Sequence, residues 1–181
     1  MIRLASSSQT RAQLLHDAGI EFIQESLDFD EDSIVASSPK NFVYQATLGK
    51  YEINLKAFGF RDYPLLVADT VVTSQNQILR KAKSVDDARN ILMTQSGNIT
   101  SIITCMIYQS PSMKLIDISS TDYIFDEFNL QDLENYLSSG DWRGKAGACM
   151  VEGFCKSYIK EVRGYESTAM GLNTEVLKRF T

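Results

Sequence analysis

Two long stretches rich in β-branched residues restrict the fold of this chain more than any other feature of its sequence. They span residues 97–108 and 114–125, and Pro111 lies in the short turn between them. Such a pair predicts two long strands that are adjacent in one sheet. A third apolar segment, residues 65–68, predicts a buried strand that ends at Asp69, and residues 71–73 are expected to continue in an extended conformation.

Helical patterns alternate with these strands. Capping residues and apolar spacing predict helices over residues 10–18, 39–58, 84–93, 129–137 and 174–180, and short strands over residues 2–5, 22–23 and 158–162. The longest helix is expected to form its apolar face from Phe42, Val43, Ala46, Ile53 and Leu55. Long adjacent strands combined with helical crossovers predict an α/β protein with a mixed sheet. At 181 residues the chain fits one domain, or one domain with two lobes.

The composition argues against several classes of partner. The net charge is −5, so there is no basic excess to displace counterions from a nucleic-acid backbone. No apolar run has the length of a membrane span, and Arg3 interrupts the only apolar residues at the N-terminus, so neither a membrane anchor nor a signal peptide is expected. We therefore expect a cytoplasmic protein with neither a membrane nor a nucleic acid as partner.

The cysteine and histidine content limits the chemistry. The three cysteines, Cys105, Cys149 and Cys155, lack the spacing of a zinc site, and the first lies in an apolar run typical of a core. The only histidine, His16, lies in the middle of a predicted helix with no nucleophile signature nearby, which argues against a catalytic triad. A metal in this chain would be held mainly by oxygen atoms, which favours Mg²⁺ or Mn²⁺.

The segment between the first predicted strand and helix has the composition of a phosphate-binding turn. Three consecutive serines end at Ser8, and Arg11 follows in the first turn of the helix. The first N–H groups of a helix lack intrahelical partners and attract anions, and an arginine can bind a phosphate through two nitrogens. Ser8 is equally well explained as the cap of the helix.

Other charged residues are candidates for catalysis or phosphate binding. Asp69, at the carboxyl end of a buried strand, could act as a general base or a metal ligand, although turn aspartates are common there. Lys81 and Lys145 could neutralise a phosphate, and Glu31 could hold a metal. These three residues, and Lys50 on the longest helix, are also compatible with a solvated surface.

In their order and spacing, these motifs resemble those of the Maf family of nucleoside triphosphate pyrophosphatases. The resemblance extends from residue 1 to about residue 180. It rests on the serine-rich turn with Arg11, Ala68-Asp69-Thr70-Val71-Val72, Lys81, Lys145-Ala146-Gly147-Ala148, Glu152-Gly153 and Met170-Gly171-Leu172. It implies a single domain over residues 1–181, with a strongly twisted mixed sheet flanked by helices and two lobes around a cleft, as in the related inosine-triphosphate pyrophosphatases.

The resemblance also implies an activity, the hydrolysis of a nucleoside triphosphate to the monophosphate and pyrophosphate, which removes unwanted nucleotides. A divalent cation, Mg²⁺ or Mn²⁺, would be required, and a homodimer is expected. The family's pattern makes Asp69 the general base. It assigns Glu31 and Lys81 to catalysis as well, Glu31 and Asp69 to the metal, and Ser8, Arg11, Lys50, Thr70, Lys145 and Glu152 to substrate binding. The alternative is a nucleotide-binding regulator of cell division and septum formation without catalytic activity.

Several positions depart from the family pattern. Thr10 replaces an arginine, Ala82 and Asn173 each replace a proline, and Cys149 replaces an aromatic residue. The preferred base also stays open. Ala68-Asp69-Thr70 is typical of relatives that act on dTTP and UTP, whereas Glu152 is typical of relatives that act on 7-methyl-GTP and, as a hydrogen-bond acceptor, suits a guanine edge.

Overall fold

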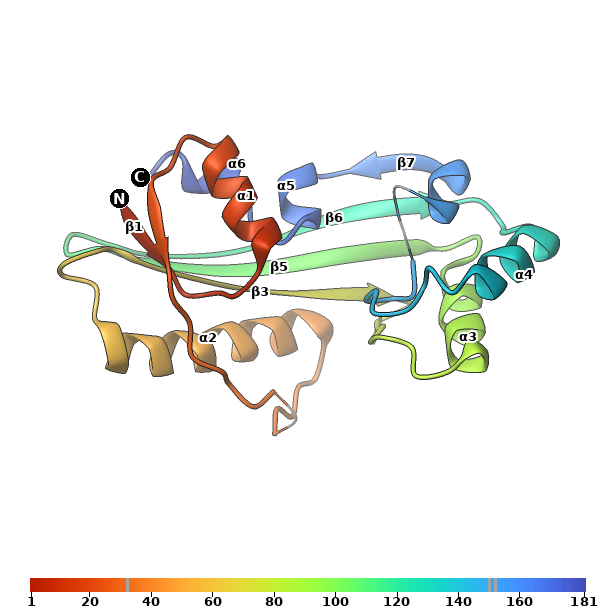
Figure 1. Ribbon diagram of the computed structural model, residues 1–181, viewed down its shortest axis with the longest axis horizontal. Helices are drawn as coiled ribbons and strands as arrows, with labels where there is room; N and C mark the ends of the chain where they lie inside the picture. Colours follow the sequence, from red (N-terminus) through yellow and green to blue (C-terminus); the bar gives the residue numbers. More distant parts are fainter. Residues whose placement is uncertain (32, 150, 152) are drawn as a thin grey trace. The chain divides into compact units, whose positions relative to one another are not determined.

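A computed structural model describes residues 1–31, 33–149, 151 and 153–181, and its centre is a mixed sheet with helices packed against it (Figure 1). The strand order is β2-β1-β3-β5-β6-β7, with β4 paired to β3. β1 is parallel to β2 and β3, whereas β4 and β7 are antiparallel to β3 and β6. The α/β class and the mixed sheet are thus confirmed. The strands are β1 (Ile2–Leu4), β2 (Phe22–Gln24), β3 (Leu65–Ser74), β4 (Gln77–Ile78), β5 (Ile99–Gln109), β6 (Lys114–Phe125) and β7 (Ile159–Arg163).

The longer helices begin at the capping residues that the sequence contains. Ser8, Ser38, Ser84 and Asn129 each accept a hydrogen bond from an N–H group of the following first turn. The predicted helices are confirmed to within a few residues, except that the last one is shorter than expected. The helices are α1 (Gln9–Asp17), α2 (Pro39–Phe58), α3 (Val85–Gln95), α4 (Leu130–Ser139), the 3₁₀ helix η1 (Phe154–Tyr158), α5 (Glu166–Ala169) and α6 (Thr174–Leu177).

The chain forms two compact units. The first unit comprises residues 1–70, 103–120 and 165–181, and the second comprises residues 71–102 and 121–164. Strands β3, β5 and β6 each begin in one unit and end in the other. Of the helices in the described part of the chain, none combines the length and the apolar character that a membrane span needs.

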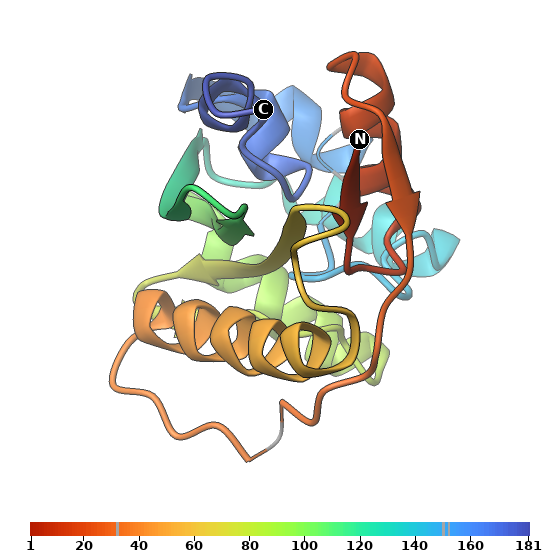
Figure 2. The ribbon, with the colours of Figure 1, turned by 90° about the vertical axis from the view of Figure 1, so that its left-hand side faces the viewer.

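In the first unit, the two faces of β3 pack against different helices (Figure 2). Leu65 and Val67 join a cluster with Tyr51 of α2. Leu66 and Ala68 belong to another cluster, which contains leucines of α1 and of the C-terminal segment. Because side chains alternate along a strand, Asp69 is expected on the α2 face of β3 and Thr70 on the α1 face.

β3 continues past Asp69 without a break. The prediction that the strand ends at this residue is wrong, because β3 runs from Leu65 to Ser74 and Asp69 lies in its middle. The residues that follow, Thr70 to Thr73, are all β-branched and favour a strand. The carboxylate is therefore held by a rigid element instead of a turn.

The expected apolar face of α2 is partly wrong. Phe42, Val43 and Ala46 are buried as predicted, but Ile53 is 36% exposed. Asn54 is buried instead, and its side-chain oxygen accepts a hydrogen bond from the N–H of Leu27. Polar residues can occupy a buried helix face when they are hydrogen-bonded in this way.

Candidate functional site

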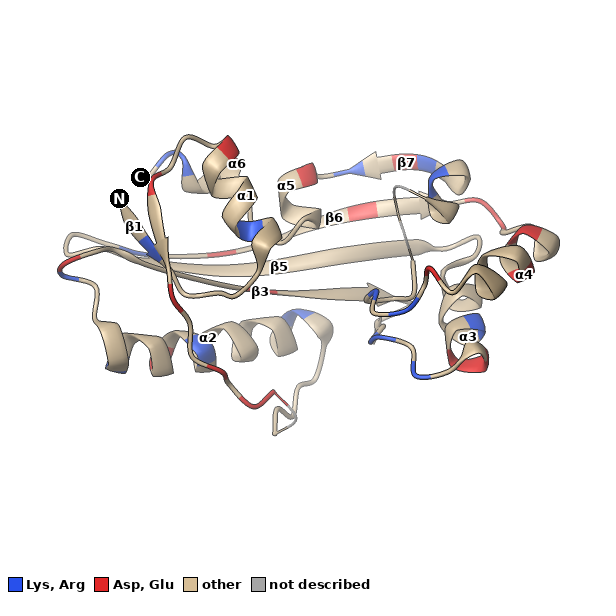
Figure 3. Ribbon diagram, viewed as in Figure 1, with Lys and Arg blue, Asp and Glu red and all other residues tan. Residues whose placement is uncertain are grey.

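Charged residues are scarce in the central strands (Figure 3). β5 has none, and Asp69 is the only one in β3. The Asp69 residue is only 7% exposed. Burying an ionised carboxylate costs free energy unless a charged or hydrogen-bonding group contacts it. The residues that contact Asp69 are therefore the place to look for the site.

Lys50 joins two carboxylates in the first unit. Its Nζ lies 2.7 Å from Asp69 Oδ1 and 2.5 Å from Glu31 Oε1. Burial raises the pKa of Asp69, and the ammonium of Lys50 acts in the opposite direction. Within the described part of the chain, the side-chain contact of Asp69 with Lys50 uses Oδ1, and Oδ2 remains to accept a proton or to bind a cation. The structure thus brings together three predicted site residues, Glu31, Lys50 and Asp69.

Arg11 lies next to the opposite face of β3. Its Nη2 donates to Thr70 Oγ1 at 3.1 Å, its Nη1 to Ser6 Oγ at 3.0 Å, and its Nε to the carbonyl of Gly171 at 2.8 Å. Burial lowers the pKa of Arg11, whereas Asp69 and Glu31 raise it. The guanidinium is therefore fixed by several segments of the first unit.

The serine-rich turn is itself ordered by hydrogen bonds. Ser8 Oγ accepts from the N–H of Arg11 at 3.3 Å, so the interpretation of Ser8 as a helix cap is confirmed. Ser6 Oγ accepts from the N–H of Ser8 at 3.2 Å, and Gln24 Nε2 donates to the carbonyl of Ser6 at 2.7 Å. The cap leaves the hydroxyl proton of Ser8 for another partner, since the Oγ acts only as an acceptor in this bond.

A pocket of about 240 Å³ opens between the turn and α2 in the first unit. The segment before Glu31 approaches α2 closely, and the ring of Phe29 lies where a Cβ on Gly49 would be. The lining residues combine serines, two cations and two carboxylates, and they are Ala5, Ser6, Ser7, Ser8, Arg11, Ser26, Leu27, Asp28, Phe29, Glu31, Lys50 and Ala68.

Two further candidates belong to the second unit. Lys81 and Lys145 are both exposed. An antiparallel bridge joins Lys81 to Ala146, and the N–H of Gly147 donates to the carbonyl of Leu79. The segments that carry the two lysines are therefore adjacent. Glu152, the predicted reader of the base, lies outside the described residues.

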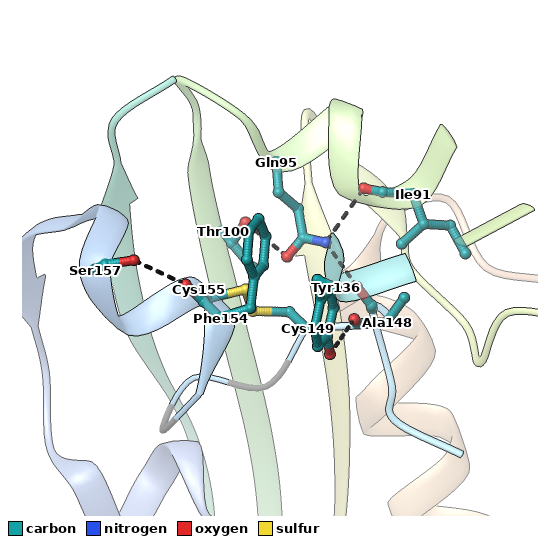
Figure 4. The surroundings of a disulfide bond; sticks show 10 residues. Ile91, Gln95, Thr100, Tyr136, Ala148, Cys149, Phe154, Cys155 and Ser157 are labelled. Atoms are coloured by element: carbon teal, nitrogen blue, oxygen red, sulfur yellow. Dashed lines mark hydrogen bonds between the residues drawn. A yellow bond between two sulfur atoms is a disulfide. The ribbon is translucent and has the colours of Figure 1, made fainter. Parts of the chain in front are cut away.

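The segment after Lys145 is held by buried side chains (Figure 4). Gln95 Nε2 donates to the carbonyl of Gly147 at 2.7 Å, and the hydroxyl of Tyr136 donates to the carbonyl of Ala148 at 3.0 Å. Cys149 forms a disulfide with Cys155. This disulfide was not expected from the sequence, although its two cysteines are only six residues apart. The prediction that Cys105 is a core residue is confirmed.

Several residues that position the site were missed. Ser6 lies in the turn but was given no role of its own, and Thr104 lies in a run interpreted only as core. Gly171 belongs to a motif that was recognised without a function. Its φ of +107° is a conformation that favours glycine, and its carbonyl accepts from Arg11. Only the folded structure shows which distant residues contact Arg11.

The two carboxylates that contact Lys50 provide some of the oxygen ligands that a hard cation such as Mg²⁺ needs. Among the described residues, no cluster of three or more histidine, cysteine, aspartate or glutamate side chains could hold a metal. Glu31 and Asp69 nevertheless converge on one ammonium. Magnesium is often bound by one or two carboxylates, with phosphate and water oxygens as its other ligands, so this pair suits a cation that arrives with a phosphate.

Comparison with known proteins agrees with the motifs. The model of the family described as Maf-like protein matches residues 1–180. Three similar proteins each carry the name nucleoside triphosphate pyrophosphatase. One from a Nitratiruptor species is 57% identical over 98% of this chain and 96% of its own length. One from Helicobacter pylori is 39% identical over 96% of this chain and 91% of its own length. The third, from Campylobacter jejuni, is 36% identical over 99% of this chain and 100% of its own length.

Proposed function

The chain belongs to the Maf family, and from this premise we propose that it hydrolyses nucleoside triphosphates to nucleoside monophosphates and pyrophosphate. The observation that carries the proposal is the buried Asp69 in contact with Lys50, close to a pocket that Arg11 and Glu31 also line. A pocket that combines cations with ionisable acids suits phosphoryl transfer, which depends mainly on positioning and charge neutralisation.

Asp69 acts as the general base in this proposal. Its free carboxylate oxygen accepts a proton from a water molecule that attacks the α-phosphorus, and pyrophosphate leaves. The rigid strand and the contact with Lys50 hold the carboxylate in place. A raised pKa makes the carboxylate a stronger base than an ordinary aspartate, which favours proton transfer.

Phosphate binding falls to the cations and the turn. Arg11 and Lys50 neutralise phosphate oxygens from the first unit, and the hydroxyl of Ser8 donates to another. By resemblance to the family, we assign Lys81 to catalysis and Lys145 to substrate binding. With a net charge of −5 on the whole chain, such cations attract a polyanion only where they are concentrated locally.

We also propose that Glu31 and Asp69 hold a divalent cation, Mg²⁺ or Mn²⁺. When bound, the cation supplies a Lewis acid that polarises phosphate oxygens. The two carboxylates are oxygen donors of the kind that such ions prefer. Lys50 keeps the carboxylates close together when the substrate is absent.

Discrimination between bases is proposed to involve Thr70 and Glu152. An ionised Glu152 accepts hydrogen bonds and suits the N–H groups of guanine. Glu152→Gln, which both donates and accepts, is expected to shift the preference towards UTP and dTTP. An unchanged ranking of substrates would show that Glu152 does not read the base.

The remaining family expectations stay proposals. They are a homodimer, a single domain with two lobes, a cytoplasmic location, no nucleic-acid or membrane partner, and a role in clearing unwanted nucleotides. The regulator of cell division is not favoured, because Glu31, Lys50 and Asp69 lie together as a hydrolytic site requires.

The direct test is pyrophosphate release from UTP, dTTP, CTP, GTP, ITP and methylated nucleotides with Mg²⁺ or Mn²⁺. We expect turnover of at least one nucleotide, and a loss of about 10²- to 10⁴-fold in Asp69→Asn. Asp17→Asn is the matched control, because the Asp17 carboxylate is exposed at the end of α1 and bonds there to Gln13 and His16, away from the pocket. Nucleotide binding by calorimetry without any pyrophosphate release would favour the regulator instead.

A further inference from the structure

The hydroxyl of Thr70 contacts Thr104 and Arg11, and the surrounding groups determine which partner donates in each hydrogen bond. Thr104 Oγ1 lies 2.8 Å from the carbonyl of Thr168 and 2.9 Å from Thr70 Oγ1. A carbonyl can only accept, so the single proton of Thr104 points to Thr168. Thr104 must then accept from Thr70, and the proton of Thr70 points to Thr104.

The position of this proton also determines how Thr70 bonds to Arg11. Since its proton is used, Thr70 Oγ1 acts only as an acceptor for Arg11 Nη2, at 3.1 Å. The bonds therefore run in one direction, from Arg11 to Thr70, to Thr104 and to the carbonyl of Thr168. Figure 1 shows the elements that they join: α1, β3, β5 and α5, all within the first unit at these residues.

The remaining contacts of Arg11 complete its orientation. Nε donates to the carbonyl of Gly171, and Nη1 donates to Ser6 Oγ. Among the residues that the structure describes, these bonds use three of the five N–H groups of a guanidinium. One N–H on each terminal nitrogen is left, which is the number that a bidentate contact with phosphate requires.

We propose that Thr104 is a positioning residue for phosphate binding, and that it acts by fixing the hydroxyl of Thr70 as an acceptor for Arg11. Thr104 is 1% exposed and does not line the pocket. Thr70, by the same argument, orients Arg11, and its part in discriminating between bases would be that of a hydrogen-bond acceptor. The inference rests on the proposed role of Arg11 in binding phosphate.

Inorganic triphosphate is the probe, because it tests phosphate binding without the base. By calorimetry, Thr104→Val is expected to weaken its binding about tenfold, since Thr70 can then rotate its proton towards Arg11. Thr104→Ser keeps the hydroxyl and should bind like the wild type. Thr47→Val is the matched control: Thr47 is also fully buried in the first unit, and its hydroxyl lies 2.7 Å from the carbonyl of Val43 on its own helix and 3.4 Å from the carbonyl of Cys105, so neither contact involves Thr70 or Arg11.

A double-mutant cycle separates positioning from a structural effect. Lysine at position 11 has no planar fork to orient. In the Arg11→Lys background, Thr104→Val should therefore cost less than twofold. With the best nucleotide, Thr104→Val should raise KM about tenfold and change kcat less than twofold.

A substitution at Gly171 tests the orientation of the Arg11 guanidinium independently of Thr104. A Cβ on Gly171 would lie 3.3 Å from both Arg11 Nε and Thr70 Oγ1. Gly171→Ala is expected to weaken triphosphate binding. Gly59→Ala should not, although Gly59 also has a positive φ, because no atom of the described residues other than its chain neighbours lies within 4 Å of its Cβ position.

Unchanged triphosphate binding in Thr104→Val would overturn the inference, and so would an equal loss in Thr104→Ser or Thr47→Val. These outcomes differ from a failure of the proposed function. In that case the wild type would bind triphosphate but release no pyrophosphate from any nucleotide.

Discussion

Adjacent residues on β3 have different electrostatic partners. Asp69 contacts Lys50 of α2, and Thr70 contacts Arg11 of α1. The alternation of side chains along a strand is sufficient to produce this arrangement. A slip of one residue in the register of β3 would exchange the two positions, so the packing of the apolar residues before Asp69 also determines the chemistry of the site.

The pH dependence of catalysis tests the environment of Asp69. A general base must be ionised, so activity is lost as the pH falls through its pKa. Burial raises that pKa, and we expect the acid limb of the kcat/KM profile above the range of an ordinary aspartate, which is about 3.9. Lys50 lowers the pKa of Asp69, so Lys50→Met should move this limb to higher pH.

Lys56→Met provides the control for this profile. Lys56 is exposed near the end of the same helix, and its removal should leave the acid limb in place. A limb that stays fixed in Lys50→Met, or moves to lower pH, would show that Lys50 does not control the ionisation of Asp69.

At the residue scale, the sequence predicts chemistry better than it predicts contacts. Arg11 and Asp69 are recognisable from their motifs because each motif is continuous in the chain. Their distant partners are not recognisable in this way: Thr70 is 59 residues from Arg11, and Gly171 is 160 residues from Arg11. Such contacts depend on how distant segments of the chain pack together, and local patterns do not determine that packing.

At the element scale, boundaries are predictable where local chemistry determines them. α2 starts at the predicted Pro39 and ends at the predicted Phe58, because Ser38 caps its start and Gly59 follows its end. The end of β3 was predicted wrongly because Asp69 was taken as a terminator. Pairing with β1 and β4 on either side of Asp69 outweighs the low strand propensity of one aspartate.

The hydrogen bond that holds the segment after Lys145 gives a prediction for the stability of the second unit. Gln95 is fully buried and donates to the carbonyl of Gly147. Gln95→Leu has a similar shape but leaves that carbonyl without its side-chain donor, and should lower the free energy of unfolding by about 1–3 kcal/mol. Urea denaturation measures this loss.

Gln13→Leu serves as the reference for the same chemical change. Gln13 is exposed on α1, and its side chain bonds to Asp17 on the same exposed face, so its replacement should change stability by less than about 0.5 kcal/mol. Equal stability of the two variants would mean that Gln95 does not hold the segment.

At the scale of the whole molecule, the two units are not separate stretches of chain. Each is assembled from distant segments, and β3, β5 and β6 contribute residues to both. Neither unit can complete its strands without the other, so we expect a single unfolding transition. The sequence indicates the mixed sheet, and two lobes are expected from it, but the bounds of these units are not predictable because both units contain parts of the same strands.

Each unit contains one buried side chain whose exposure can be used to follow the unfolding of that unit. Trp142, the only tryptophan, is 2% exposed in the second unit. Cys105 is fully buried in the first unit, where burial raises the pKa of its thiol to about 11 and protects it from modification. In a urea titration, tryptophan fluorescence and the labelling of Cys105 should have the same midpoint. Separate midpoints would show that the units unfold independently.

The position of bond cleavage tests the central claim most directly. The proposed attack of water on the α-phosphorus places the water oxygen in the nucleoside monophosphate. Hydrolysis of the best substrate in ¹⁸O-labelled water, followed by mass spectrometry of the products, should therefore show the label in the monophosphate and none in pyrophosphate. Label in pyrophosphate, or the formation of a nucleoside diphosphate with labelled orthophosphate, would contradict the account.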